Sequence, residues 1–266
     1  MCELFGMSSN TPSSVTFSLT GFSARGGRTG EHTDGWGAAF YEGKAWQIYT
    51  DSQACALSPI AQWLTQHPIK SYQVIAHIRK ATQGIVSSEN CHPFSHLHER
   101  SMWVFAHNGD LKNFRPFITG SYKPQGTTDS ELAFALLMQA IESHPQQSYS
   151  DYFDLLLPLI KEISMHGSFN FLLSNGQVMY AHCSTNLHYV ARQYPFSKAH
   201  LVDADMSIDL NLHNSPGDKM ILIATHPLTH EESWKKIKPG EFLMFCSGEL
   251  KRLEHTGIHP PTAANS

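Results

Sequence analysis

Residues 71–79, Ser-Tyr-Gln-Val-Ile-Ala-His-Ile-Arg, and residues 102–107, Met-Trp-Val-Phe-Ala-His, share the pattern Val-x-Ala-His. The first segment alternates in polarity, so His77 and Arg79 project from the same face near the end of a strand. The second segment is apolar on both faces up to its last residue, which is typical of a strand covered on both sides. Two strands that end alike predict a shared rim at which their polar residues meet.

Further strands and helices are expected in blocks around these two segments. The additional strands are predicted at residues 2–8, 36–41, 44–50, 168–174, 177–183, 187–192, 219–225 and 241–246, and the helices at residues 57–66, from Thr128 and from about Asp151. Residues 11–37 predict a glycine-rich loop, residues 200–218 a polar connection and residues 251–266 a loose tail. Along the chain, strands come first, then helices, then strands again. This order favours two sheets packed face to face with helices outside, and it argues against a fold in which strands and helices strictly alternate.

The helix from Thr128 shows the clearest start signal. Thr128 is followed three residues later by Glu131, which predicts a capping box. Leu132, Leu136 and Ala140 would then continue one apolar face of this helix. In the next helix, the apolar stripe runs from Tyr152 to Ile163, and Pro158 lies off it.

Composition excludes several classes of protein. The chain has 266 residues, of which 41% are hydrophobic, and this argues against wholesale disorder. Lys and Arg number 19 against 23 Asp and Glu, and this slightly acidic balance argues against nucleic-acid binding as the main function. No stretch approaches the ~20 apolar residues of a membrane helix, and no signal peptide is recognisable. We therefore expect a cytoplasmic protein that binds neither membrane nor nucleic acid.

Cys2 differs from the other cysteines through its position. The five cysteines are widely spaced and form no C-x-x-C, which argues against a zinc ribbon and a disulfide scaffold. If Met1 is removed, Cys2 carries both a thiol and a free α-amine. An α-amine with a pKa near ~8 can act as the base for the thiol of the same residue. A cysteine at the start of a strand is also often simply packed, so Cys2 alone does not decide between these interpretations.

Asn108 and Gly109 follow the apolar strand 102–107. The Asn amide and the Gly backbone N–H can point two donors at one oxygen, which is the geometry of an oxyanion hole. Glycine allows a close backbone approach or a positive φ. An ordinary Asn-Gly turn explains the same pair of residues.

Two charged residues complete the set. Arg79 at a strand end can bind a carboxylate with two parallel hydrogen bonds, although a surface salt bridge is the simpler explanation. Asp129 in the first turn of a helix can bind an ammonium group, although an acid is favourable there in any case. Taken with Cys2 and the Asn-Gly pair, they fit an α-amino acid whose side chain carries an acyl group, such as glutamine.

Several motifs occur in an order that is specific as a set. They are Met1-Cys2-Glu3-Leu4-Phe5-Gly6, Arg25-Gly26-Gly27, His32-Thr33-Asp34-Gly35-Trp36-Gly37, His77-Ile78-Arg79-Lys80-Ala81-Thr82, Asn90-Cys91-His92-Pro93-Phe94, His107-Asn108-Gly109 and Thr127-Thr128-Asp129-Ser130-Glu131, with 180–187 and 223–229 downstream. In these motifs the chain resembles the class II (N-terminal-nucleophile) glutamine amidotransferases, most closely their small stand-alone YafJ-type members.

The resemblance implies an α+β fold, a four-layer αββα sandwich of two mainly antiparallel sheets with outer helices (the Ntn-hydrolase fold). It implies one domain over residues 2–250, with Met1 removed. The implied catalytic residues are Cys2, Asn108 and Gly109, and the implied substrate-binding residues are Arg79, Thr82, Asp129, Arg25 and His77. Where many relatives have Trp and His around the Thr of the clamp motif, this chain has Lys80 and Gln83.

By the roles of that family, Cys2 attacks the γ-amide of glutamine to form a thioester, and ammonia and glutamate are released without a cofactor. The partners implied are glutamine or a γ-glutamyl small molecule and a separate synthetase that uses the ammonia. A homodimer is compatible with the sequence. Two alternatives stay open, namely a γ-glutamyl amide or peptide hydrolase and a non-catalytic glutamine-binding sensor.

The histidines raise a metal hypothesis. His92, His96 and His98 lie close together, and His226 and His230 are four residues apart. The chain has no H-E-x-x-H motif and no carboxylate at a suitable spacing, and residues 96–98 are expected in a polar loop. We therefore expect no metal.

Overall fold

Two large sheets form the centre of the structure, a computed structural model that describes residues 2–82 and 84–257. The strands of the first sheet are β1 (Glu3–Ser14), β2 (Trp36–Tyr41), β3 (Trp46–Asp51), β4 (Lys70–Ile78), β9 (Leu187–Gln193), β12 (Lys219–Ala224) and β13 (Lys235–Ile237). Those of the second sheet are β5 (Phe94–His98), β6 (Ser101–Leu111), β7 (Gly167–Ser174), β8 (Val178–His182), β14 (Glu241–Cys246) and β15 (Glu249–His255).

The order of the strands is β13-β9-β12-β1-β4-β2-β3 in the first sheet and β15-β14-β8-β7-β6-β5 in the second. Each pairing in these two sheets is antiparallel. A small third sheet pairs β10 (Lys198–His200) with β11 (Ser207–Asp209). Single turns of 3₁₀ helix occupy Cys55–Leu57, Ser88–Asn90 and Leu210–Leu212.

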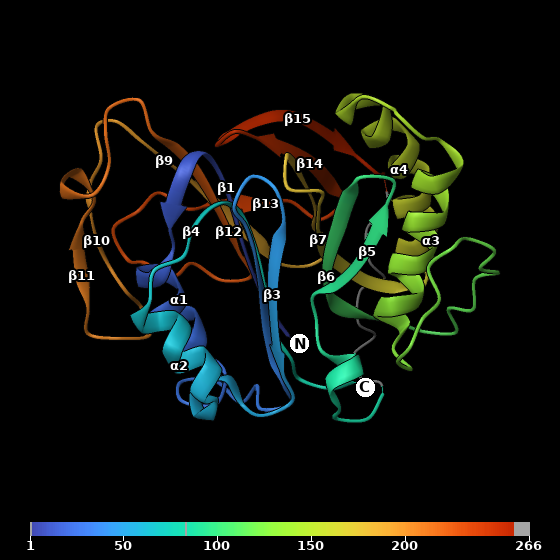
Figure 1. The fold of residues 1–266 in the computed structure, drawn as a ribbon, viewed down its shortest axis with the longest axis horizontal. Helices are drawn as coiled ribbons and strands as arrows, with labels where there is room; N and C mark the ends of the chain where they lie inside the picture. The colour runs from blue at the N-terminus through green and yellow to red at the C-terminus, as the bar shows by residue number, and fades with distance from the viewer. Residues whose placement is uncertain (1, 83, 258–266) are drawn as a thin grey trace.

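Helices cover the outer faces of both sheets. Helices α1 (Thr16–Ala24) and α2 (Pro59–Gln66) lie against the first sheet, and helices α3 (Asp129–Ser143) and α4 (Tyr149–Ser164) lie against the second (Figure 1). The order of the layers is therefore helix, sheet, sheet, helix. This confirms the predicted αββα sandwich of antiparallel sheets.

Three apolar cores separate the four layers, and strand alternation explains them. In β4, Val74 and Ala76 face the core under α1 and α2, whereas Ile75 faces the core between the sheets. In β6, Phe105 faces the core under α3 and α4, whereas Val104 faces the core between the sheets. A strand with apolar side chains on both faces is thus covered on both faces, as the pattern of residues 102–107 predicts.

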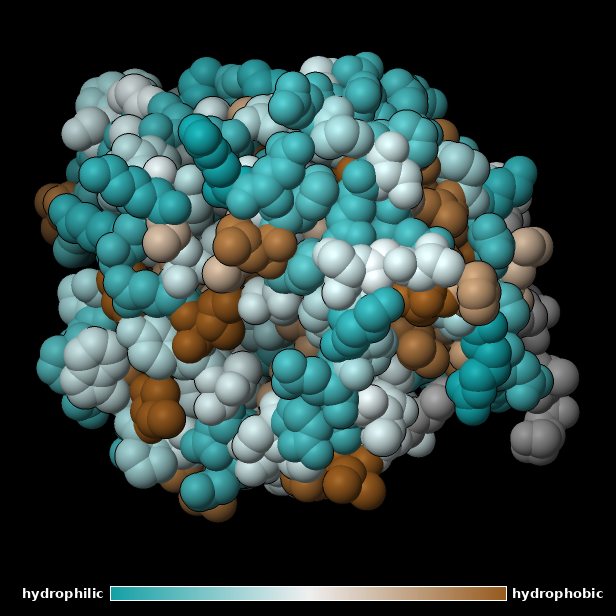
Figure 2. Space-filling model, turned by 45° about the vertical axis from the view of Figure 1, so that its right-hand side comes forward, coloured by the Kyte–Doolittle hydropathy of each residue, from teal (hydrophilic) through white to brown (hydrophobic). Residues whose placement is uncertain are grey.

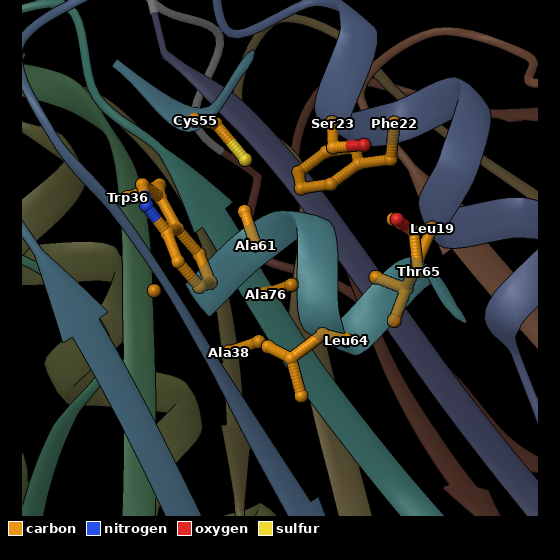
Figure 3. A pocket seen from close by; sticks show the side chains of 11 residues that line it. Leu19, Phe22, Ser23, Trp36, Ala38, Cys55, Ala61, Leu64, Thr65 and Ala76 are labelled. Carbon is orange, nitrogen blue, oxygen red and sulfur yellow. The ribbon is translucent and has the colours of Figure 1, made fainter. Parts of the chain in front are cut away.

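The outer core under α1 and α2 contains a small void. Figure 3 shows α1 and α2 facing Trp36 and Ala38 of β2 and Ala76 of β4, with Leu64 pointing toward the sheet. The void has a volume of about 20 Å³, which is room for about one water molecule. It is a gap in side-chain packing and not a ligand site.

Two predicted loops contain regular structure. Residues 11–37 contain α1, which sequence inspection misses because no side chain caps its N-terminus and Gly21 lies within it. A Cβ on Gly21 would lie 3.0 Å from a methyl carbon of Leu201, so glycine permits the close approach of this helix to the neighbouring segment. The predicted polar loop at residues 96–98 is strand β5, which pairs with β6.

Helix α3 begins as predicted but with a different hydrogen-bond pattern. The hydroxyl of Thr128 accepts a hydrogen bond from the backbone N–H of Glu131 at 3.2 Å. The carboxylate of Glu131 instead accepts from the backbone N–H groups of Gln125 and Gly126, so the reciprocal half of the capping box is not made. A complete capping box stands at Ser148 and starts α4.

The buried face of α3 also differs from the prediction. Leu132 and Leu136 are partly buried and pack against the edge of this core, while the fully buried residues of the helix are Ala133, Phe134, Leu137, Met138 and Ile141. The helix is apolar over most of its circumference, so the sequence offers more than one plausible stripe. The stripe that packs on β6 is the one with the larger side chains.

The prediction of a loose tail is wrong for residues 251–255. Strand β15 pairs along β14, so these residues form the edge of the second sheet. Residues 258–266 and Met1 lie outside the described part of the chain. The predicted connection at 200–218 includes β11 and one 3₁₀ turn.

The surface is polar over most of the face shown in Figure 2, with hydrophobic residues in separate small areas. Within residues 2–82 and 84–257, no helix combines the length and apolarity needed to cross a membrane.

Candidate active site

Three neighbouring strands of the first sheet place residues side by side at the same end of the sheet. Cys2 directly precedes β1, whose Glu3 pairs with Ile78 of β4 and whose Phe5 pairs with Ala224 of β12. Arg79 directly follows β4, and Thr225 directly follows β12. Because β1 lies between β4 and β12, Cys2 has Arg79 on one side and Thr225 on the other.

The second sheet adds Asn108 to this edge. The Asn108 side-chain amide nitrogen donates to the backbone carbonyl of Cys2 at 2.6 Å and lies 3.4 Å from the Thr225 hydroxyl. Residues 77–79 and 107–109 therefore lie together as predicted, although β6 does not end there and continues to Leu111. This rim joins the two sheets beside the thiol.

Cys2 is partly buried, and its thiol is held by the backbone of the segment after β4. Its sulfur accepts a hydrogen bond from the backbone N–H of Lys80 at 3.2 Å. Burial raises the pKa of the Cys2 thiol above the ordinary value of 9.0, and the Lys80 N–H and the Arg79 charge oppose this rise without cancelling it. The thiol is therefore protonated at neutral pH, and nucleophilic attack needs a group that takes its proton.

Gly109 is tightly enclosed. A Cβ at this position would lie 1.8 Å from the carbonyl oxygen of Ser168 and 2.4 Å from the His107 ring. Its φ is not positive, so a left-handed backbone does not explain the glycine. The close approach of the neighbouring atoms explains it. The Asn-Gly pair is part of strand β6 and does not form a turn.

Asn170, which sequence inspection did not single out, fixes the backbone of Asn108. Its amide nitrogen donates to the Asn108 carbonyl and to the Thr185 hydroxyl, each at 2.8 Å. Its amide oxygen accepts from the backbone N–H groups of Ser184 and Thr185. Asn170 is completely buried, and it connects the end of β6 to the segment after β8. The Asn108-Gly109 motif gives no signal for this partner 62 positions away.

Arg79 is buried and held by the chain around it. Its guanidinium donates to the carbonyls of Ile85 at 3.0 Å and Gly84 at 3.4 Å. Its own backbone pairs with Asp34 and Gly35, and the Asp34 carboxylate also accepts from the N–H of Ala81 at 2.8 Å. The 32–37 motif therefore shapes the segment that carries Arg79.

Asp129, the first residue of α3, is also buried. One carboxylate oxygen accepts from the backbone N–H of Leu111 at 2.7 Å, which ties α3 to the end of β6. Both Arg79 and Asp129 are close enough to affect the pKa of Cys2. The structure thus brings together the four sequence features that suggested a site for an α-amino acid.

Asn90 links the two charged residues and was also missed as an individual residue. Its amide nitrogen donates to the Ile85 carbonyl at 3.1 Å, and its amide oxygen accepts from the N–H of Thr127 at 2.9 Å. Ile85 contacts Arg79, and Thr127 lies two residues before Asp129. This buried amide therefore fixes the spacing between the segments carrying Arg79 and Asp129.

Arg25 lies beside the residue that follows the nucleophile. Its guanidinium donates to the carboxylates of Glu3 at 3.0 Å and Asp203 at 2.8 Å, and to the carbonyls of His226 and Pro227. The second carboxylate oxygen of Glu3 lies 2.9 Å from Nδ1 of His226. Arg25 thus ties the start of β1 to the segment after β12.

The remaining predicted residues lie near the rim. His77 is fully buried with its ring 4.2 Å from that of His92, and burial lowers its pKa to about 3. It stays neutral at physiological pH. Thr82 lies exposed in the segment after Arg79, and Gln83 lies outside the described residues.

A cavity of about 440 Å³ opens beside Cys2. Its lining comes from Cys2, Glu3, His32, Asn108, Thr185, Asn186, Thr225 and His226. The lining does not include Arg79 or Asp129. Within the described ranges, no group of three or more His, Cys, Asp or Glu side chains is arranged to hold a metal ion.

Comparison of the sequence with known proteins identifies the family to which the chain is similar. The model for class II glutamine amidotransferases matches residues 1–265. A Haemophilus influenzae protein named "Putative glutamine amidotransferase" is 48% identical over 251 residues, which cover 94% of this chain and 85% of the relative. The Escherichia coli K12 protein named "Putative glutamine amidotransferase YafJ" is 45% identical over 252 residues, which cover 94% and 99%.

Solved structures agree. A crystal structure described as a "predicted glutamine amidotransferase" from Pseudomonas aeruginosa PA01 has 36% identity and a TM-score of 0.75, covering 94% of this chain and 99% of that one. Glutamine phosphoribosylpyrophosphate amidotransferase from B. subtilis, at 15% identity and a TM-score of 0.61 over 97% of this chain and 50% of that one, shares the fold. The chain belongs to the class II glutamine amidotransferases.

Proposed function

We propose that the protein hydrolyses the γ-amide of glutamine through a thioester on Cys2 and releases ammonia and glutamate. The observation that carries this proposal is the closeness of Cys2 to the Asn108 amide, which donates to the Cys2 backbone carbonyl, with Arg79 and Asp129 near enough to act on the thiol. Arg79 would bind the α-carboxylate, helped by Thr82, and Asp129 would bind the α-ammonium group.

The reaction has two balanced steps. The Cys2 sulfur forms a bond to the carbonyl carbon of the γ-amide, the carbon–nitrogen bond of that amide breaks, and the thiol proton leaves on ammonia. Water then attacks the thioester, which gives glutamate and restores the thiol. In both steps the Asn108 amide and the Gly109 N–H would stabilise the negative oxygen of the tetrahedral intermediate.

The base in this proposal is the α-amine of Cys2 after removal of Met1. The raised pKa of the Cys2 thiol supports this role, because a protonated thiol needs a nearby proton acceptor. An α-amine has a pKa near ~8 and is therefore partly neutral at pH 7 to 8. The ammonia acceptor would be held by a separate synthetase chain.

The decisive experiment is incubation with a glutamine analogue that carries an electrophile at the γ-position, followed by mapping of the modified residue. We expect one label on Cys2, protection by glutamine, and no label on Cys2→Ala. The buried Cys183, in the same chain, serves as an internal control. Saturable glutamine binding without label or ammonia release would instead indicate a sensor.

The role of the amine is tested separately. A non-removable N-terminal extension should abolish ammonia release from glutamine, while the same extension at the C-terminus should not. Intact-mass measurement should show that active protein lacks Met1. Full activity of a chain that retains Met1 would contradict the amine as base.

A further inference from the structure

Another cavity lies at the end of the sandwich that is far from Cys2. On β4, Gln73 pairs with Ser8 of β1, which is six positions along the chain from Cys2. At about 3.3 Å per residue of strand, Gln73 and Cys2 are roughly 20 Å apart. The volume of this cavity is about 420 Å³, and sites for small organic molecules have volumes of about 300–1,000 Å³. Both sheets contribute to its lining, which consists of Ser9, Tyr41, Gly43, Tyr72, Gln73, Tyr149, Gly176, Gln177, Cys246 and Ser247.

Gln73 gives this cavity a buried hydrogen-bond donor. The residue is only 2% exposed, and its amide oxygen accepts from the Ser174 hydroxyl at 2.6 Å. The Ser174 oxygen itself accepts from the Gly176 N–H at 2.9 Å, so its one proton goes to Gln73 and fixes the orientation of the amide. Among the residues that the structure describes, the Gln73 amide nitrogen has no hydrogen-bond partner. A buried donor without a partner costs free energy, and an acceptor on a molecule in the cavity would remove that cost.

Tyrosine rings form part of the lining, and glycines hold two of them in place. Tyr41 of β2 lies opposite Gln73 on the neighbouring strand. A Cβ on Gly176 would lie 2.5 Å from the Tyr41 ring, and a Cβ on Gly43 would lie 3.2 Å from the Tyr72 ring. Because both glycines lack a side chain, the backbone of each turn packs closely on a ring. The cavity therefore presents aromatic side chains whose positions are set by the surrounding backbone.

The rest of the lining is polar but carries no charge. The Tyr149 hydroxyl donates to the amide oxygen of Gln177, which leaves the Gln177 amide nitrogen as a second donor. Of the described residues that line the cavity, none is Asp, Glu, Lys, Arg or His. A charged ligand would lose hydration there without gaining an opposite charge. Aromatic rings and amide donors instead match a flat, uncharged ring that carries hydrogen-bond acceptors.

We propose that this cavity binds an uncharged heteroaromatic ring with hydrogen-bond acceptors, such as the base of a nucleoside. The ring would pack on the tyrosine side chains, and a ring nitrogen or carbonyl oxygen would accept from the Gln73 amide. This site is separate from the proposed chemistry of Cys2, because the two lie at opposite ends of β1. Its test therefore does not depend on amide hydrolysis.

Cys246 supplies the readout, because it lines the cavity and is partly exposed, whereas Cys55, Cys91 and Cys183 are buried. The full chain is treated with iodoacetamide in the presence of adenosine, uridine or nicotinamide, and peptide mass spectrometry gives the labelling rate of each cysteine. We expect at least one compound to slow labelling of Cys246 saturably, by about tenfold at ten times its Kd. Labelling of Cys2 should not change, and ribose, which lacks the heteroaromatic ring, should have no effect. Unchanged labelling of Cys246 with all three compounds, or equal protection by ribose, would overturn the proposal.

Two variants locate the bound compound. Gln73→Leu removes the buried donor and Tyr72→Ala removes a ring, and each should weaken the affinity of the protecting compound about fivefold to tenfold. Gln62→Leu is the matched control for Gln73→Leu, because Gln62 is exposed on α2 and does not line the cavity. Urea denaturation identifies a variant that fails to fold, and the other variant then makes the test. Wild-type affinity in a folded cavity variant, or an equal loss in Gln62→Leu, would contradict binding in this cavity.

Discussion

The backbone around Gly109 leaves no room for a side chain. We expect Gly109→Ala to destabilise the protein by about 1–3 kcal/mol, because the added methyl group would overlap the Ser168 carbonyl of the neighbouring strand. Chemical denaturation measures this loss. Gly217→Ala is the matched control, since a Cβ there meets nothing within 4 Å. Equal stability of the two variants would show that β6 and β7 can separate at this point.

Asn108 makes a separate kinetic prediction. Replacing it by alanine removes the side-chain donor beside Cys2. We expect kcat for glutamine hydrolysis to fall about a hundredfold or more, with a smaller change in KM. Steady-state kinetics with an ammonia assay would measure both constants. Unchanged kcat would mean that another group stabilises the oxyanion.

Single residues with distinctive chemistry could be found in the sequence, but the residues that hold them in place by hydrogen bonds could not. Cys2, Arg79, Asn108 and Asp129 stand out because each lies at the start or end of an element predicted from the sequence, and the structure brings them together. Asn90 and Asn170 carry no such mark, since a lone Asn in a sequence is most often a turn residue. Their importance comes from hydrogen bonds across 37 and 62 positions, which no local pattern reveals.

Helix α2 allows a test of how the outer layer is held. Leu64 is buried beside the small void, whereas Ile60 on the same helix is 42% exposed. We expect Leu64→Ala to lower the free energy of unfolding by about 2–5 kcal/mol, because it enlarges a gap that is already present. Ile60→Ala should cost less than about 1 kcal/mol. Urea denaturation of both variants makes the comparison, and similar losses would show that α2 is not anchored through Leu64.

Elements were predictable where the period of hydrophobicity was unambiguous. The strand over 71–79 is marked by alternation, the strand over 102–107 by apolar residues on both faces, and the hairpin after residue 36 by its turn; all are present, although β6 continues to Leu111. Helix α1 lacks a capping side chain, and its burial depends on neighbours distant in sequence. Strand β15 is an edge strand with mostly polar residues, so its composition does not predict a strand. Its pairing with β14 makes it one.

The whole molecule should lose stability on acidification. Burial lowers the pKa of His77 to about 3 and of His182 to about 4, and places that of His92 well below the ordinary value of 6.5. In the folded chain these rings stay neutral, whereas in the unfolded chain they take up protons below about pH 6.5. The unfolded state therefore gains stability as the pH falls, by up to about 1.4 kcal/mol per histidine and pH unit.

Urea denaturation at pH 7.5, 6 and 5 would measure this effect. We expect the free energy of unfolding to be nearly constant above pH 7 and to decrease below pH 6.5. His182→Gln should reduce the slope, because it removes one of the buried rings whose pKa is lowered in the folded chain, whereas His67→Gln, at an exposed position, should not. A free energy that stays constant or rises from pH 6.5 to 5 would contradict the assignment.

The pairing of β1 with β12 has a consequence for the order of events in the cell. The Leu4 N–H bonds to Thr225, which lies 221 positions further along the chain. A nascent polypeptide on the ribosome can therefore contain the thiol long before it contains the neighbours that bury and orient it. The proposed chemistry of Cys2 would therefore be withheld from translation products that stop before Thr225, because the pocket needs both partners of this pairing.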